Sequence, residues 1–161
     1  MSLWYDADTM AIEAAQRVNP LGNLVVEIFR VNGALLSSGN LMTRDVGMSS
    51  ARWQVVGALE MAGRPLSVSQ IARNMGLARQ SVQRLVNELW ADSFVVLADN
   101  PDHRRASLVS LTPTGRRVFR KIMDRQVVWS EQILATTALS ERRIGEVTST
   151  LRRLREALEG K

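Results

Sequence analysis

Two short helical patterns joined by a glycine turn lie in the middle of this 161-residue chain, and they constrain its fold more than any other feature. Ser67 can cap the first helix while Gln70, three residues later, reaches back to the N–H group of the cap. Gly76 ends this helix, because glycine adopts the left-handed conformation at a helix C-terminus at the lowest cost. A second helix can then begin near Ala78, so the stretch predicts a helix-turn-helix.

The second helix has an apolar face and a polar face. The apolar residues recur in one arc at about 100° per residue, and they are Val82, Leu85, Val86 and Leu89. The opposite face carries side chains that can hydrogen-bond with base edges in a DNA major groove. The residues that we expect to read bases are Gln80, Ser81, Gln83 and Arg84. Arg79, near the helix start and to one side, is placed for a phosphate. A solvated polar face is the alternative, and this helix alone gives the two interpretations equal weight.

A β-hairpin with a basic tip follows the helices. Alternating or continuous apolar runs predict strands at 94–97 and 107–111, with a polar turn between them. A hairpin in this place is typical of the wing of a winged helix. We expect Arg104 and Arg105 to enter a minor groove or to hold phosphate. Weak surface ion pairs with Asp99 and Asp102 are the alternative.

This region carries a recognisable set of residues: Leu66-Ser67, Ile71-Ala72, Gly76-Leu77, Val82, Arg84-Leu85-Val86, Leu89, Pro101-Asp102-His103-Arg104-Arg105-Ala106, Val109-Ser110-Leu111-Thr112 and Gly115. The set resembles the multiple-antibiotic-resistance regulator (MarR) family of bacterial transcription factors. The resemblance implies a dimeric winged-helix protein that binds DNA and is often released from it by a small ligand. The order of the predicted elements extends it from about Leu21 to the C-terminus.

Three positions depart from the pattern of that family. Ala78 stands where Ser or Thr is common, so the second helix lacks its usual side-chain cap, a loss of about 1 kcal/mol. Ser93 stands where a glycine is usual at the end of that helix. His103 stands where an acidic residue is common, two positions before the wing arginine, if that arginine is Arg105. These departures concern local geometry and leave the expected fold unchanged.

We expect one mostly helical subunit over residues 1–161, with a winged helix-turn-helix lobe at 49–111 and a small β-wing. Dimerisation helices are expected at 6–38 and 113–159. Within the first of these ranges, Pro20 separates an Ala-rich helical pattern at 6–18 from a stronger amphipathic helix that runs to about Ser38. A loop at 39–48 and a helix at 51–61, closed by Gly63, lead into the lobe, and Arg64–Leu66 is expected to pair with the wing as a short strand.

The last helix carries a heptad-like apolar seam after a capping serine at Ser140. The seam residues are Ile144, Val147, Leu151, Leu154 and Leu158, and matching N-terminal residues are Leu21, Leu24 and Ile28. A narrow seam near a chain end needs a partner, which is either the same chain or a second copy. We favour a second copy, because a winged helix that reads one half-site gains affinity from a two-fold mate. The operator is then expected to be a pseudo-palindrome.

Composition excludes several classes of protein. The chain has 21 Lys and Arg against 16 Asp and Glu, a net charge of +5, which suits a polyanionic partner without identifying it. Double-stranded DNA is the partner expected from the helix-turn-helix, and a membrane surface would also fit the charge alone. It has no cysteine, so a disulfide framework, a thiolate metal site and a thiol redox switch are excluded. No apolar run reaches the length of a signal peptide core or a membrane helix, and a cytoplasmic protein with no membrane partner is expected.

Enzymatic chemistry has no candidate constellation in this sequence. The single histidine, His103, stands among arginines and is expected to face DNA or solvent. We expect no catalytic residues, no metal and no cofactor. The resemblance implies a small-molecule pocket between the dimerisation helices and the winged helix, for an aromatic or anionic effector. Its candidate residues, for which core packing is the alternative, are Phe29, Arg30, Trp53 and Val118.

The sequence therefore predicts a bacterial, homodimeric transcription regulator that binds a specific operator, and repression is favoured over activation. Two alternatives stay open: an architectural protein that binds DNA without choosing sequence, and a protein-interaction module built on a winged helix. Polar rather than lysine-rich side chains at Gln80, Gln83 and Arg84 argue against the first. The arginines of the wing argue against the second.

Overall fold

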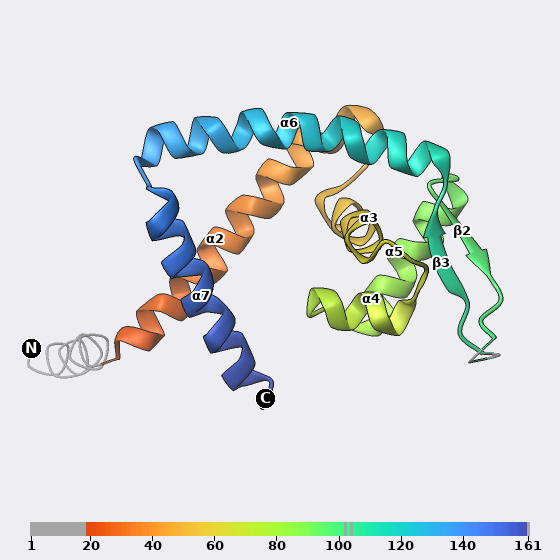
Figure 1. Ribbon diagram of the computed structural model, residues 1–161, viewed down its shortest axis with the longest axis horizontal. Coiled ribbons are helices and arrows are strands. Elements are labelled where there is room, and N and C mark those ends of the chain that lie inside the picture. Colours follow the sequence, from red (N-terminus) through yellow and green to blue (C-terminus); the bar gives the residue numbers. More distant parts are fainter. Residues whose placement is uncertain (1–18, 102, 104, 161) are drawn as a thin grey trace, which may run out of the picture. The chain divides into compact units, whose positions relative to one another are not determined.

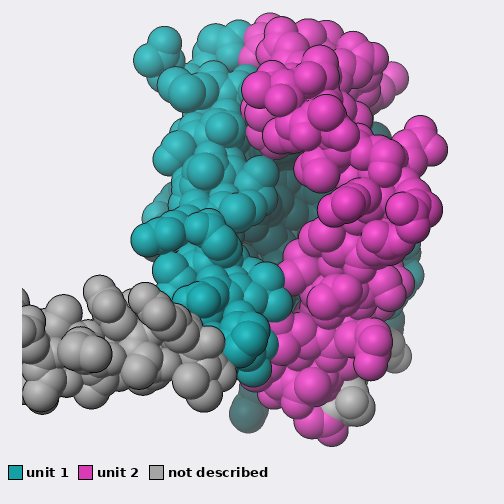
Figure 2. Space-filling model, turned by 90° about the vertical axis from the view of Figure 1, so that its left-hand side faces the viewer, with its two compact units in different colours: residues 1–116 teal, residues 117–161 magenta. Residues whose placement is uncertain are grey.

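The computed structural model describes residues 19–101, 103 and 105–160. The helical pattern at 6–18 and the wing residue Arg104 lie outside these described residues. The chain divides into two compact units, residues 1–116 and residues 117–161, which Figure 2 colours teal and magenta. We refer to them as the first and the second unit and describe each separately.

The elements, labelled as in Figure 1, follow in chain order: α2 (Pro20–Thr43), η1 (Arg44–Val46), α3 (Ser50–Ala62), β1 (Leu66–Ser67), α4 (Val68–Met75), α5 (Arg79–Ala91), β2 (Val95–Ala98), β3 (Leu108–Leu111), α6 (Pro113–Thr137) and α7 (Glu141–Leu158). The fold is mostly helical with one small sheet, as the sequence predicts. None of the helices in the described ranges is long and apolar enough to cross a membrane.

The apolar face of α5 forms the centre of the core of the first unit. All four of its predicted apolar residues are buried: Val82, Leu85, Val86 and Leu89. They pack in a core to which α3, α4 and the strands contribute Val55, Val56, Leu59, Leu66, Ile71, Val95 and Val109. Burial of side chains of this size contributes about 1.5–3 kcal/mol each. This packing, rather than helix propensity, fixes which face of α5 is left for solvent.

The helix-turn-helix begins with the capping box that the sequence predicts. The Ser67 hydroxyl accepts a hydrogen bond from the Gln70 N–H at 3.3 Å, and the Gln70 side-chain oxygen accepts one from the Ser67 N–H at 2.8 Å. Gly76 ends α4 with a φ of 63°, in the left-handed region. Both predicted ends of α4 are therefore confirmed, and α5 begins at Arg79, directly after the predicted start near Ala78.

The wing is the outer hairpin of a three-stranded antiparallel sheet in the order β1-β3-β2. Leu66 of β1 pairs with Val109 of β3, and Val95 of β2 pairs with Leu111 of β3. The short strand before α4 thus pairs with the wing, as predicted. Because side chains alternate along a strand, Val109 and Leu111 point together into the core while Ser110 between them does not.

The prediction of a loop at 39–48 is wrong over its first half, because α2 continues to Thr43 and a 3-10 turn follows. Gly39 does not break the helix but lets it pass close to α3, since a Cβ atom there would lie 2.5 Å from the Ser50 Oγ. The Thr43 hydroxyl lies 2.8 Å from both the Gly39 and the Met48 carbonyl oxygens. The helix end is therefore stabilised by contacts that a local sequence pattern does not show.

The start of α6 is fixed by Thr112 and Gly115. The Thr112 hydroxyl accepts a hydrogen bond from the Gly115 N–H at 2.9 Å and lies 2.8 Å from the Ser93 carbonyl oxygen. A Cβ atom at Gly115 would collide with the carbonyl oxygen of Phe94. The Thr112 side chain therefore caps α6, and the glycine allows the close approach of two backbone segments.

In the second unit, α7 begins at its predicted cap. The Ser140 hydroxyl accepts from the Arg143 N–H at 3.4 Å. The apolar seam of this helix is largely uncovered in the single chain, with 56% of Val147 and 80% of Leu158 exposed.

Candidate nucleic-acid interface

The exposed face of α5 presents the residues that were expected to contact DNA. They are Arg79, Gln80, Ser81, Gln83 and Arg84, and each is exposed. Ala78 precedes the helix in an extended conformation and makes no side-chain hydrogen bond to it, as its methyl group dictates. The N-terminal N–H groups of α5 therefore lack a side-chain acceptor from the cap residue.

Two side chains on this face are held by neighbours one helical turn away. The Gln83 Nε2 donates to the Asn87 Oδ1 at 2.9 Å, and the Arg84 guanidinium pairs with the Glu88 carboxylate. The Arg84 side chain is 69% exposed, so the pair is weak and screened by solvent. Both side chains are directed along the helix and can exchange these partners for a base at little cost.

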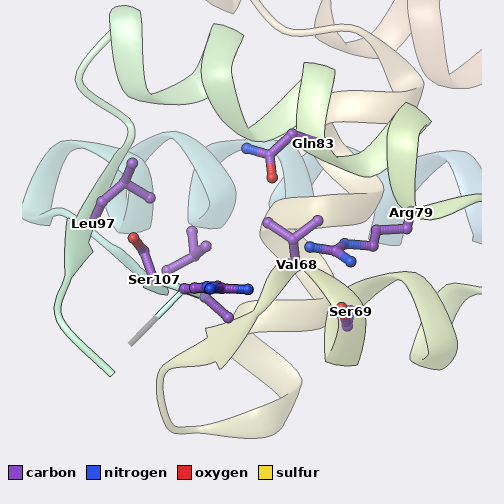
Figure 3. A pocket seen from close by; sticks show the side chains of 9 residues that line it. Val68, Ser69, Arg79, Gln83, Leu97 and Ser107 are labelled. Carbon is purple, nitrogen blue, oxygen red and sulfur yellow. The ribbon is translucent and has the colours of Figure 1, made fainter. Parts of the chain in front are cut away.

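A small cavity of about 120 Å³ joins α5 to the wing and to α4. Figure 3 shows Arg79 and Gln83 of α5 around it, together with Val68 and Ser69 of α4 and Leu97 and Ser107 of the wing strands and turn. Arg105 of the wing also lines this cavity. The exposed face of the helix and the wing therefore form one continuous surface.

A larger concavity of about 820 Å³ extends this surface between α4 and the wing. Its basic residues come from four segments and are Arg64, Arg73, Arg79, His103 and Arg105. No Asp or Glu is among the described residues that line it. Because the described residues that line the concavity are cationic or uncharged, they favour the approach of an anion.

The sequence did not single out Arg64, Arg73 or Ser69 of this concavity. Only the excess of arginines in this part of the chain and the four-residue spacing of Ser69 and Arg73 gave a signal. Within the described residues, the guanidinium groups of Arg73, Arg79 and Arg105 have no carboxylate partner, whereas that of Arg84 does. A phosphate can therefore bind these three without displacing an internal ion pair.

Arg52 fixes the C-terminal end of α5, which the sequence also did not predict. Its Nη2 pairs with Asp92, its Nη1 donates to the Gly47 carbonyl oxygen at 3.1 Å, and its guanidinium carbon lies 5.6 Å from the centroid of the Phe94 ring. The Arg52 side chain is only 13% exposed, so these contacts are shielded from solvent. They join the start of α3 to the end of the helix that carries the recognition face.

The structure does not bring together the effector residues that belong to the first unit. Phe29 is 70% exposed, and Arg30 forms an ion pair with Glu27 at 3.1 Å. Trp53 lies against α2 at Gly39, ten residues and about 15 Å along the helix from Phe29. Val118 lies in α6 of the second unit, and the role of all four stays a prediction.

The residues predicted to dimerise are only partly covered in the single chain. On α2, Leu21 and Leu24 are exposed and Ile28 is half-buried, while Ile144 and Leu154 of α7 are half-buried and Leu151 is exposed. Among the described residues, no group of three or more His, Cys, Asp or Glu side chains is placed to hold a metal ion.

A sequence model of the MarR family matches residues 46–106, from the turn before α3 to the wing. The chain belongs to the MarR family. Its members are DNA-binding transcription regulators and not enzymes, and the matched residues hold the helix-turn-helix and most of the wing.

Relatives of this MarR-family chain extend over most of its length. The protein Rv2011c of Mycobacterium tuberculosis is 34% identical over 139 residues, which cover 86% of this chain and 94% of that protein. The transcriptional activatory protein BadR of Rhodopseudomonas palustris is 25% identical over 138 residues, 84% of this chain and 77% of BadR.

Solved structures of the family show the same fold. The MarR/EmrR family regulator from Acinetobacter sp. ADP1 has a TM-score of 0.77 at 19% identity, and the match covers 89% of this chain and 99% of that one. PcaV from Streptomyces coelicolor, solved in complex with its natural ligand, has a TM-score of 0.69 at 22% identity and covers 88% and 95% of the two chains.

Proposed function

We propose that this MarR-family chain binds a pseudo-palindromic operator as a homodimer and represses transcription from it. The observation that carries the proposal is the composition of the exposed face of α5. Gln80, Gln83 and Arg84 offer paired donors and acceptors, which match the edges of adenine and guanine in a major groove. A face built only for charge would carry lysine or arginine throughout.

The arginines around that face have a separate role in this proposal. Arg79 at the start of α5 and Arg105 at the wing are exposed and have no carboxylate partner among the described residues. Contacts of this kind position a protein on the duplex without reading its sequence. We assign His103 and Arg104 to the same part of the interface, with Arg104 taken from the sequence alone.

The dimer is supported by the uncovered apolar seam of α7. Val147, Leu151 and Leu158 are all exposed in the single chain, at the spacing with which helices pair. A two-fold axis would place two copies of α5 in successive major grooves about 34 Å apart. The half-sites would then lie about 10 base pairs apart on one face of the DNA.

We propose repression because a dimer seated on promoter DNA excludes polymerase with no further contact, whereas activation needs an additional surface. The relative BadR is named as an activator. Expression of a reporter gene placed behind the operator distinguishes repression from activation. Deletion of the gene for this protein raises reporter expression if the protein represses and lowers it if the protein activates.

Release by a small aromatic or anionic molecule is the second part of the proposal, and the ligand complex of PcaV supports it. A ligand of this kind would favour a dimer whose recognition helices do not match the operator spacing. Phe29, Arg30, Trp53 and Val118 remain the proposed ligand residues.

Selection of bound fragments from random duplex DNA at about 150 mM salt tests the proposed function, because non-specific contacts are strongly weakened there. We expect enrichment of one pseudo-palindrome. Recovery of no common sequence, with binding that disappears as salt rises, would show an architectural protein. Absence of DNA binding even at low salt would show a protein-interaction module.

A further inference from the structure

Two arginines that line the concavity between α4 and the wing lie outside the predicted DNA interface. Arg64 stands in the turn before β1, and Arg73 stands near the end of α4. Both are exposed. They line the same concavity as Arg79 and Arg105, which are part of the proposed DNA-binding face.

We propose that Arg64 and Arg73 bind backbone phosphates of the operator DNA, and so form a second phosphate-binding surface on each subunit. This inference rests on the proposed function, because it extends the DNA contact beyond α5 and the tip of the wing. The ligand chemistry is that of phosphate diester oxygens held by guanidinium groups without sequence selection.

The side chains of α4 support this assignment. Ser69 and Arg73 are one turn apart and share a face of the helix, with Gln70 beside them. The Gln70 Oε1 is already engaged by the N–H of Ser67, which leaves its amide N–H₂ group as a donor. Hydroxyl and amide donors beside an arginine without a carboxylate partner are typical of a phosphate contact.

The electrostatics favour DNA over a protein partner. Four arginines and one histidine line the hollow, and none of its described lining residues is acidic. Its apolar lining residues are small or short, namely Pro65, Pro101, Ala106 and Leu108, and they offer no large aromatic anchor of the kind that dominates protein interfaces. Arg79 and Arg105 line both this concavity and the small cavity beside α5. One DNA duplex could therefore contact both.

The test compares Arg64→Ala, Arg73→Ala and the double variant with wild type, on the selected operator and on a random duplex of the same length. Each lost phosphate contact lowers the steepness of the salt dependence by about 0.9 and weakens binding about fivefold at 0.15 M salt. We expect the same fold loss on both duplexes. Arg153→Ala, at an exposed position of α7 in the second unit, is the matched control and should change neither quantity.

A further variant distinguishes a phosphate contact from a structural role. Arg64→Lys with Arg73→Lys keeps the charge, so it should restore most of the salt dependence, because lysine also binds phosphate as a point charge. Failure of the lysine variant to restore the salt dependence would overturn the proposal. So would a loss confined to the operator, since that is the signature of base reading.

Other outcomes separate this inference from the proposed function. If wild type selects an operator and the double variant binds it unchanged, the inference is wrong and the proposed function stands. If the double variant keeps its DNA binding but loses affinity for inorganic tripolyphosphate, the hollow holds a free anion and not the duplex. If wild type selects no operator, the proposed function itself fails.

Discussion

Two arginines five residues apart on α5 are given different roles by their surroundings. Arg84 lies in the middle of the exposed face and is oriented by Glu88, whereas Arg79 lies at the helix start beside the hollow that Arg105 shares. The first geometry suits a base edge and the second suits a phosphate. We therefore expect Arg84 to contribute to specificity and Arg79 to contribute to affinity.

The variants Arg84→Ala and Arg79→Ala separate these roles. Arg84→Ala should lose about 1–3 kcal/mol on the operator and little on random DNA, and should relax the preference at one base pair. Arg79→Ala should weaken both duplexes equally and reduce the salt slope by about one. Titrations of both DNAs at several salt concentrations measure these effects, and equal losses on both for Arg84→Ala would contradict its role.

Ser93 occupies a position where the backbone favours glycine. Its φ is 61°, and its exposed side chain gives no compensating burial. Ser93→Gly should therefore raise the free energy of unfolding by about 1 kcal/mol, measured by chemical denaturation. Ser93→Ala is the control and should give no such gain, because alanine keeps the Cβ atom. An equal gain in both would mean that the backbone conformation is not the cause.

At the scale of elements, the junction between β2, β3 and α6 depends on a glycine that allows close contact. Gly115→Ala places a Cβ atom against the Phe94 carbonyl oxygen and should cost about 1–3 kcal/mol of stability, as overpacking does. Gly145→Ala on α7 meets no atom within 4 Å and should stabilise the helix by up to about 1 kcal/mol. Thermal unfolding of both variants measures the two changes in stability. Equal changes in the two variants would contradict this explanation.

The local elements follow from short-range signals, and the errors arise where distant segments meet. The capping box at Ser67, the left-handed Gly76 and the apolar period of α5 each lie within a few residues, and the structure confirms all three. Gly39 looked like a helix end because its contact, Ser50, lies on another helix. In the same way, Arg52 meets Asp92 forty residues away.

The parts of the candidate site that lie on a single helix could be predicted from the sequence, and the parts that distant segments bring together could not. The face of α5 is set by the period of a single helix, so its residues could be assigned from the sequence. The concavity lined by Arg64, Arg73 and Arg105 forms only when the wing packs beside α4. No single stretch of sequence shows it. The family match adds the function of the lobe but not the roles of individual residues.

At the scale of the whole molecule, the uncovered seam of α7 predicts a dimer. Burial of a leucine side chain contributes about 1.5–3 kcal/mol. In a two-fold dimer one substitution removes this contribution from both subunits. Leu151→Asp should therefore raise the dimer dissociation constant by at least about a hundredfold in analytical ultracentrifugation. Ser149→Asp, on the opposite side of the helix, should leave it unchanged. A stable dimer with Leu151→Asp would exclude this seam as the interface.

The most direct test of the account is the ratio of dissociation constants for the selected operator and a scrambled duplex of equal length, measured at about 150 mM salt. A regulator that reads sequence through α5 is predicted to bind the operator at least about a thousandfold more tightly. A ratio near one, together with a steep fall in binding as salt rises, would contradict base reading and leave only binding by charge.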